Sequence, residues 1–218
     1  MTLQLLTAPK NYSSWSVRPW LLLTHFGIPF QEVVAPLFAE DGAKELILSW
    51  SAAGTVPVLR DGELRVGDSL AIMEYVAELY PDKALWPRDS AARAQARSVS
   101  AEMHASFMAV RSEMPMNARA SVAGLNFSDD AKSDIARICD IWTECRQGYG
   151  SHGPFLFGDF TIADAMYAPI ASRFKTYGVR LEGECDTYAA ALLQTEAAQK
   201  WYKVAREEPW TVEQYELG

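Results

Sequence analysis

Apolar residues in the first third of the chain fall into short runs and helix-spaced sets, which predicts strands mixed with helices. Residues 3–7 form an apolar run typical of a buried strand, and residues 30–35 form a second run that ends at Pro36. Between them, residues 16–26 have the spacing of a helix that stops at Gly27. Two strands joined by a helix make a βαβ unit, whose strands are parallel.

The following stretch predicts a helix, a hairpin and another helix. Residues 40–50 are weakly helical, and strands at 56–60 and 64–66 flank Asp61-Gly62, a dipeptide suited to a tight turn. Gly67-Asp68-Ser69 then opens a helix with a capping residue. The predicted buried face of this helix consists of Leu70, Met73, Val76, Ala77 and Tyr80.

The pattern changes at residues 80–90, which lose their periodicity, carry prolines and charges, and indicate a linker. Helical spacing continues beyond it, and helices are expected at residues 90–119, 128–147, 161–175 and 186–206. We therefore predict an α/β plus all-α fold, with a βαβ-α-ββα domain at residues 1–81 and an all-helical domain at residues 88–218.

Two short patterns carry more local information. Pro57 begins a strand that should be central, where a missing N–H is poorly tolerated. A cis Val56–Pro57 bond would free the Val56 backbone to face a ligand, whereas a trans proline on an edge strand is the ordinary alternative. Thr161 and Asp164 have the spacing of a capping box, which predicts a helix start with a structural role.

Composition and charge exclude several classes of partner. The chain has 218 residues, is 49% hydrophobic and carries a formal net charge of -8. Nucleic acids and anionic membranes need clustered Lys and Arg, so we expect neither as a partner. No basic leader and no run of about 18 apolar residues occurs. Cys139, Cys145 and Cys185 match neither a zinc site nor a disulfide framework, so we expect no metal and a reduced, cytoplasmic protein.

Residues 11–19 form a polar, hydroxyl-rich corner between the first strand and the first helix. A helix start presents unpaired backbone N–H groups, so the corner suits an anion, and we interpret it as a thiolate site. Pro19 fits only the first turn of a helix, which puts the cap near Ser16 and leaves Ser13 and Ser14 in the turn. Both serines have a plainer interpretation as turn and capping residues.

The order and spacing of these features resemble the glutathione S-transferase superfamily over nearly the whole chain. The most specific pieces are Val56-Pro57, Asp68-Ser69, Leu85-Trp86-Pro87 followed by Ala92-Arg93-Ala94, and the box from Thr161 to Asp164. The resemblance implies a thioredoxin-like first domain that holds glutathione as co-substrate. By position, the Val56 backbone, beside Pro57, would pair with the cysteinyl part of glutathione, while Asp68 and Ser69 would hold its γ-glutamyl end.

The resemblance also suggests which hydroxyl faces the sulfur. Ser14 to Arg18 is similar to the Ser-Trp-x-Val-Arg ending of the zeta-class motif, and an ungapped match puts Ser13 where that class has cysteine. This register favours Ser13 as the catalytic hydroxyl and puts Asn11 at the position of the usual serine of that class. The spacing of theta-like members allows Ser14 instead, and Tyr12 is a third candidate.

The electrophile is expected between the domains, against the first helix of the second half. A stripe at helical spacing there combines soft, aromatic and cationic groups, namely Met103, His104, Phe107, Met108 and Arg111. The same stripe is consistent with ordinary helix packing. Arg111 and Arg173 would suit an acidic substrate, or would be solvated or paired with acids.

We therefore expect a glutathione transferase that activates the glutathione thiolate for conjugation to, or isomerisation of, a small electrophile. Members of the superfamily are usually homodimers, so a homodimer is expected here. Isomerisation of the maleylacetoacetate type is one sub-case. A glutathione-fold protein that only binds or has a structural role is the alternative from another class, and the retained hydroxyls and glutathione-end residues favour the enzyme.

Overall fold

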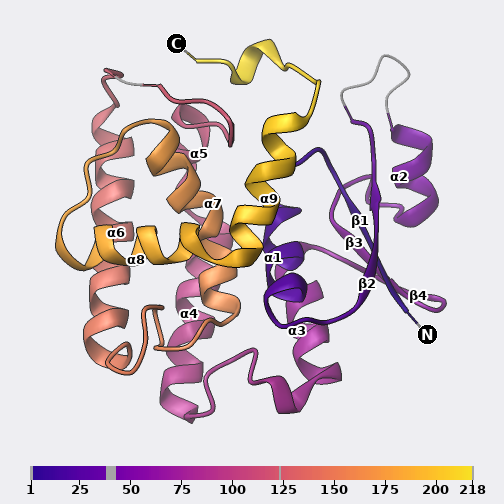
Figure 1. Cartoon of the computed structure of the whole chain (residues 1–218), viewed down its shortest axis with the longest axis horizontal. Coiled ribbons are helices and arrows are strands. Elements are labelled where there is room, and N and C mark those ends of the chain that lie inside the picture. The colour runs from indigo at the N-terminus through magenta and orange to yellow at the C-terminus, as the bar shows by residue number, and fades with distance from the viewer. Residues whose placement is uncertain (1, 38–42, 123, 218) are drawn as a thin grey trace.

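The computed structural model describes residues 2–37, 43–122 and 124–217, in which a small sheet is followed by helices, as predicted (Figure 1). The first part contains β1 (Leu3–Thr7), α1 (Val17–His25), β2 (Phe30–Val34), α2 (Lys44–Trp50), β3 (Val58–Asp61), β4 (Leu64–Gly67) and α3 (Ser69–Leu79). The second part contains α4 (Ser90–Ala105), α5 (Met108–Glu113), α6 (Asp129–Tyr149), α7 (Ile162–Thr176), α8 (Gly183–Gln194) and α9 (Glu196–Glu207). The predicted α/β plus all-α fold is confirmed, while the domain limits at residues 81 and 88 stay a prediction.

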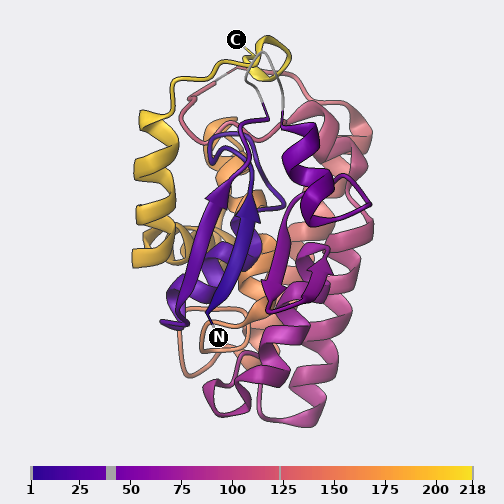
Figure 2. The same cartoon turned by 90° about the vertical axis from the view of Figure 1, so that its right-hand side faces the viewer.

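The four strands have the order β2-β1-β3-β4, with β1 and β2 parallel and the other pairs antiparallel. Successive side chains of a strand point to opposite faces of the sheet, so Leu5 and Leu6 enter different cores. Leu6 joins a small cluster with Ile47 and Trp50 of α2. Leu5 joins the large cluster on the other face. There α1 and α3 lie between the sheet and the helical part (Figures 1 and 2).

The large core continues from the first part of the chain into the second. It includes Leu21 of α1 and Ile72 of α3 together with Trp142 of α6 and Trp201 of α9. The central helix, α7, is buried along nearly its whole length and packs against α1, α4 and α8. Because one continuous core joins the two parts, the residues between them are held in fixed positions.

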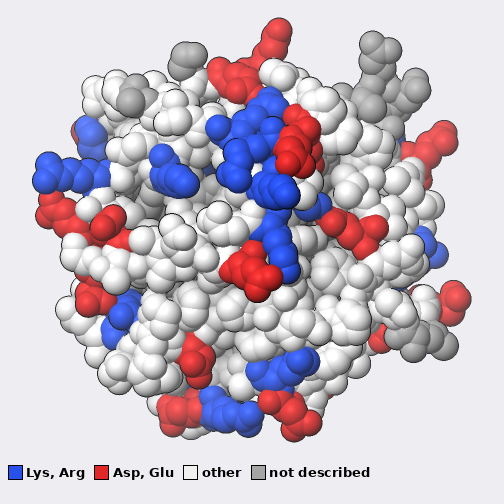
Figure 3. Space-filling model, in the orientation of Figure 1, with Lys and Arg blue, Asp and Glu red and all other residues white. Residues whose placement is uncertain are grey.

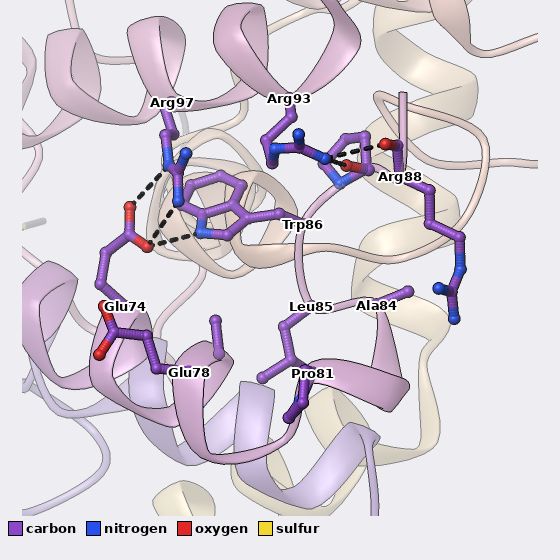
Figure 4. Close-up of a pocket in the computed structure, with 11 residues that line it drawn as sticks. Glu74, Glu78, Pro81, Ala84, Leu85, Trp86, Arg88, Arg93 and Arg97 are labelled. Atoms are coloured by element: carbon purple, nitrogen blue, oxygen red, sulfur yellow. Dashed lines mark hydrogen bonds and ion pairs between the residues drawn. The ribbon is translucent and has the colours of Figure 1, made fainter. Parts of the chain in front are cut away.

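The linker is attached to both parts at one polar junction (Figure 4). The Glu74 carboxylate of α3 accepts hydrogen bonds from Trp86 Nε1 (2.9 Å) in the linker and from Arg97 Nε (3.0 Å) on α4. The Arg97 guanidinium also lies 5.5 Å from the centre of the Trp86 ring. The junction therefore fixes α3 relative to α4.

Two local expectations are corrected by the structure. Asp61 pairs with Leu64, so the hairpin turn is Gly62-Glu63, one residue later than Asp61-Gly62. Gly62 has φ of +58°, a value that glycine adopts easily at the first position of such a turn. In α3 the buried face consists of Ser69, Ile72, Met73 and Val76. Residues 70, 77 and 80 are only partly buried.

The two longest helices predicted for the second half of the chain are each divided into two helices in the structure. The segment 90–119 is divided between α4 and α5 because Phe107 takes φ of +65°, a left-handed conformation that no helix continues through. The segment 186–206 is divided at Thr195, whose Oγ1 caps α9 by accepting the Ala198 N–H (3.2 Å). Both breaks change which side chains face the rest of the molecule.

Charged side chains of both signs are mixed on the face seen in Figure 3. Lys and Arg form a narrow band over α9, with acidic side chains beside it. None of the helices in the described part of the chain is long and apolar enough to cross a membrane.

Candidate functional site

The corner between β1 and α1 is built by hydrogen bonds among its serines. Ser13 donates its hydroxyl proton to Ser16 Oγ (2.8 Å), and its own oxygen accepts the Ser16 N–H (3.2 Å). Ser16 Oγ also accepts the Ala8 N–H (3.0 Å), and α1 begins directly after Ser16, as predicted. Ser14 is buried, and within the described residues its hydroxyl has no hydrogen-bond partner. The proton of Ser13 is therefore used inside the corner, while that of Ser14 is available to a ligand.

The other two candidates at the corner are occupied. Asn11 Nδ2 donates to Asn117 Oδ1 (2.9 Å), and Asn11 Oδ1 accepts the Arg119 N–H (2.9 Å). The Tyr12 hydroxyl is hydrogen-bonded to the Glu216 carboxylate and accepts from Arg119 (2.9 Å). Burial, together with the bond to Glu216, raises the pKa of Tyr12. Asn11 and Tyr12 hold other parts of the chain in place.

A cavity of about 420 Å³ lies beside this corner. The four residues predicted for glutathione all line it, namely Val56, Pro57, Asp68 and Ser69, and its other lining residues include Trp15 and His104. The Val56–Pro57 bond is cis, the first of the two alternatives considered for this proline. The fold therefore brings residues of the β3 start, the α3 start and α4 together around one space.

Asp68 has an unusual backbone conformation, and the two oxygens of its carboxylate have different partners. Its φ of +70° lies in the left-handed region, which costs a non-glycine residue energy and is common at ligand sites. One oxygen caps α3 by accepting the N–H groups of Leu70 (2.8 Å) and Ala71 (3.2 Å). The other oxygen lies 3.2 Å from His104 Nε2, and the Asp68 side chain, which lines the cavity, is 46% exposed. A ligand ammonium can therefore reach it.

A second cavity, of about 300 Å³, adjoins the first. Trp15 and Val56 line both cavities, so they form the partition between them. The second cavity is also lined by Ser13, Ser14, Arg111 and Arg173, together with Tyr215 from the C-terminal segment. The serine corner and two arginines thus face one space.

The two arginines of the second cavity are held by backbone carbonyls. Arg173 is buried and donates from Nε to Met114 O (2.7 Å), and burial followed by the charge of Arg111 lowers its pKa to about 10. Arg111 donates from Nε to Ser106 O (2.9 Å), and its pKa is lowered by burial. Across the described residues neither arginine forms an ion pair with a carboxylate. The cavity is therefore electropositive.

A third arginine, Arg18, packs against Trp15, one of the two residues shared by the cavities. Arg18 of α1 is fully buried, with its guanidinium 4.4 Å from the centre of the Trp15 ring. Its only hydrogen bond is a long one from NH1 to Ser69 Oγ (3.5 Å), and among the described residues Nε and NH2 have no partner. Burial lowers its pKa well below the usual value, and the charges of Arg111 and Arg173 lower it further.

Of the predicted electrophile stripe, only Arg111 lines the second cavity. His104 instead lies in the first cavity, beside Asp68. Met103 and Phe107 are buried in the core, and Met108 is 64% exposed, so these three residues are outside both cavities as described. The reason is the break at Phe107, because residues on either side of it do not share one helical face. Trp15 and Tyr215 line the cavities but were not predicted as site residues. No pattern in the sequence indicates that Tyr215, near the end of the chain, lies beside the serine corner.

Both parts of the chain match known domain families. Residues 12–79 match the family described as Glutathione S-transferase, N-terminal domain. Residues 93–203 match the family described as Glutathione S-transferase, C-terminal domain. These two matches leave only the linker and the chain ends uncovered.

The chain is also similar in sequence to individual proteins. The chain is 32% identical to Protein IN2-1 of Zea mays over 127 residues. This match covers 58% of this chain and 47% of that protein. It is 38% identical over 92 residues to the probable maleylacetoacetate isomerase of Caenorhabditis elegans, covering 42% and 41% respectively. The matches thus span less than half the length of either relative.

Among solved structures, the fold is similar to a glutathione transferase homologue from Burkholderia GL BGR1, solved with bound glutathione. The TM-score is 0.73 at 20% sequence identity, over 95% of this chain and 100% of that one. At this low sequence identity, the similarity supports the fold and no finer conclusion.

Proposed function

The chain belongs to the glutathione S-transferase family, and we propose that it activates the thiolate of glutathione toward a small electrophile that carries a carboxylate. Glutathione is the co-substrate and occupies the first cavity. The electrophile occupies the second cavity. The observation that carries the proposal is that Ser14 lines the same space as two arginines that have no carboxylate partner among the described residues.

The first cavity offers a group for each polar end of glutathione that the family pattern assigns to it. The Val56 backbone, freed from sheet pairing, suits the peptide bonds of the cysteinyl part. The Asp68 carboxylate suits the α-amino group, and the start of α3 at Ser69 suits the α-carboxylate, because a helix start favours an anion. This arrangement directs the sulfur toward the partition at Trp15 and Val56, and so toward the second cavity.

The thiol has to be ionised before it can react. A thiol with a pKa near 8.5 is only about 3% thiolate at pH 7. A hydroxyl that donates to sulfur near the start of α1 stabilises the anion. Among the described residues the Ser14 hydroxyl has no hydrogen-bond partner, so it is the hydroxyl proposed to donate to the thiolate.

The cations of the second cavity determine the proposed class of electrophile. Arg111 and Arg173 carry positive charge that the described residues leave without a carboxylate, so an anionic substrate would supply the missing partner. Maleyl-type dicarboxylic acids fit this chemistry. Addition of a thiolate to their double bond, rotation about the resulting single bond and loss of the thiolate convert the cis isomer to the trans isomer. The name of the nematode relative is consistent with this sub-case.

The test compares carboxylate-bearing and neutral electrophiles with and without glutathione. We expect glutathione-dependent turnover of maleylacetoacetate or maleylpyruvate, with kcat/KM above that for neutral 1-chloro-2,4-dinitrobenzene. Arg111→Met should lower kcat/KM for the carboxylate substrates by about 10-fold to 100-fold, as for loss of one hydrogen bond to a charged group, and leave the neutral substrate nearly unchanged. Equal losses for both kinds of substrate would remove the carboxylate from the proposal.

The alternative, a protein that binds glutathione without catalysis, is separated by the same assay. Glutathione binding by calorimetry, combined with no turnover of any substrate in the panel, would favour it.

A homodimer is also proposed, because it is the usual assembly of this family. Light scattering that gives a monomer at micromolar concentration would contradict it. Three free cysteines support a reducing, cytoplasmic location.

A further inference from the structure

Two free cysteines meet where α6 packs against α8, away from both cavities. The Cys185 thiol donates a hydrogen bond to the carbonyl oxygen of Cys139 (Sγ···O 3.3 Å), and its sulfur lies 3.5 Å from Thr143 Oγ1. The Cys185 thiol therefore sits over the turn of α6 that contains Cys139. The interaction between the two thiol groups is also the largest cause of the pKa shift of each residue.

The two sulfurs differ in access to solvent. Cys139 is partly exposed, whereas Cys185 is 5% exposed. The sulfur of Cys139 is therefore expected to meet solvent more often than that of Cys185. The remaining cysteine, Cys145, is 1% exposed, and burial raises its pKa to about 12, so it is expected to stay an unreactive thiol.

The surroundings also divide the roles of the pair. Cys185 lies in the first turn of α8, where the helix dipole favours a thiolate. Hydrogen bonds from the Cys139 thiol and the Thr143 hydroxyl lower the pKa of Cys185, against burial and the nearby charges of Asp140 and Glu184. The same contact raises the pKa of Cys139. The helix start and these hydrogen bonds favour ionisation of Cys185, and its thiol must give up its hydrogen bond to the Cys139 carbonyl oxygen before it reacts.

We propose that Cys185 and Cys139 form a peroxide-sensitive pair that closes to a disulfide between α8 and α6. In the first step the Cys185 thiolate attacks one oxygen of hydrogen peroxide. An S–O bond forms, the O–O bond breaks, and hydroxide leaves and takes up a proton to become water, which gives a sulfenic acid.

In the second step the Cys139 sulfur attacks the sulfenic sulfur. An S–S bond forms, the S–O bond breaks, and the oxygen leaves as water with the proton of the Cys139 thiol. Overall two thiols lose two electrons and two protons, and one peroxide becomes two molecules of water. The disulfide joins two helices of the core, so its formation should raise the melting temperature of the protein. None of these steps depends on the proposed glutathione chemistry.

The experiment treats the purified full-length protein with hydrogen peroxide and follows intact mass, free thiols and linked peptides. We expect a mass loss of about 2 Da, a fall from three free thiols to one, and a peptide that links Cys139 to Cys185. Dithiothreitol should reverse all three changes. A wild-type protein that keeps three thiols, or gains oxygen without a cross-link, would overturn the proposal.

Single variants separate the roles, with Cys145→Ser as the matched control that should close the disulfide as the wild type does. Cys139→Ser should stop at a sulfenic acid on Cys185, which dimedone traps. Cys185→Ser should leave Cys139 reduced at the same peroxide concentration. If Cys139 were oxidised as fast in that variant as in the wild type, Cys185 would not be the reacting thiol. Circular dichroism checks that each variant is folded, and the wild-type peptide map decides the question even if one variant is not.

Discussion

A serine hydroxyl has one proton to donate, and at the corner between β1 and α1 this separates two neighbouring residues. Ser13 gives its proton to Ser16, while Ser14 keeps its own available beside the second cavity. Ser14→Ala is therefore expected to raise the thiol pKa of bound glutathione by about 1–2 units, because a hydrogen bond to a charged group contributes about 1.5–3 kcal/mol. Thiolate absorbance followed against pH measures the shift, and turnover at neutral pH should fall with it.

Ser13→Ala is the matched control for this prediction. It removes a hydroxyl of the same kind one residue away and should lower stability slightly, because Ser16 loses a partner, with little effect on the thiol pKa. The sequence register had favoured Ser13, since Trp15, Val17 and Arg18 anchor it to the zeta-class motif. A pKa shift in Ser13→Ala but not in Ser14→Ala would restore that register. Which hydroxyl is free depends on side-chain rotamers that residue spacing does not specify.

Asp68 gives the second prediction at this scale. Asp68→Ala should weaken glutathione binding by about 1–3 kcal/mol, because the α-amino group loses a charged acceptor. Calorimetry measures the affinity. Asp89→Ala is the control, since Asp89 caps α4 by accepting the Ala92 N–H (2.8 Å) but does not line the first cavity. Equal affinity in the two variants would exclude Asp68 from the glutathione site.

At the scale of the elements, the start of α7 shows how a sequence pattern becomes a stable structure. Thr161 and Asp164 form the predicted capping box. The Asp164 carboxylate accepts the N–H groups of Thr161 (2.8 Å) and of Leu156 (3.1 Å) and is fully buried. It therefore holds the loop before α7 as well as the helix.

Asp164→Ala is expected to cost about 2–4 kcal/mol in the free energy of unfolding, because two buried N–H groups lose their acceptor. Thr195→Ala, which removes the cap of α9 and the hydrogen bond that the same hydroxyl donates to Leu192 O (2.9 Å), should cost about 0.5–2 kcal/mol. Urea unfolding of both variants measures the difference. The capping box lies outside both cavities, so glutathione turnover per folded molecule should persist in Asp164→Ala. A large loss of turnover in folded protein would assign the box a catalytic role.

The elements that sequence predicts well are those whose signals are local. The apolar run of β1, the stop at Gly27 and the capping box of α7 depend on neighbouring residues, and each is found where expected. The break between α4 and α5 is different, because Phe107 is neither glycine nor proline, and its left-handed backbone is held by burial of its ring. The residues predicted to bind the electrophile do not share one helical face for that reason, since the prediction assumed one continuous helix.

At the scale of the whole molecule, the C-terminal segment returns to the first corner. The Glu208 carboxylate accepts the N–H groups of Lys10 (2.7 Å) and Asn11 (2.9 Å), which directly precede the serines. Arg119 donates to the carbonyl oxygens of Glu208 (3.0 Å) and Trp210 (2.9 Å). This long-range contact joins residues near both ends of the chain, and no local pattern in the sequence predicts it.

Glu216 completes this contact and gives it a dependence on pH. Burial by itself would raise the pKa of Glu216, but hydrogen bonds from Tyr12, Asn117 and Arg119 outweigh burial and lower it below the ordinary value of 4.5. A carboxyl group with a lowered pKa binds fewer protons in the folded protein than in the unfolded one. Its contribution to stability is therefore present above the unfolded pKa and is lost as the pH falls through the folded pKa.

The last prediction follows from this sign. The difference in the free energy of unfolding between wild type and Glu216→Gln should be constant above about pH 5 and should shrink as the pH falls below about 4. Urea unfolding of both proteins across this range measures it. Glu213→Gln removes the same charge from the same segment, and in the described part of the chain its side chain makes no hydrogen bond, so it should show no such change. Because Tyr215 lines the second cavity, Glu216→Gln should also raise KM for the electrophile while glutathione affinity stays the same. A pH-independent difference would mean that the segment is held by Glu208 and Arg119 without a contribution from the charge of Glu216.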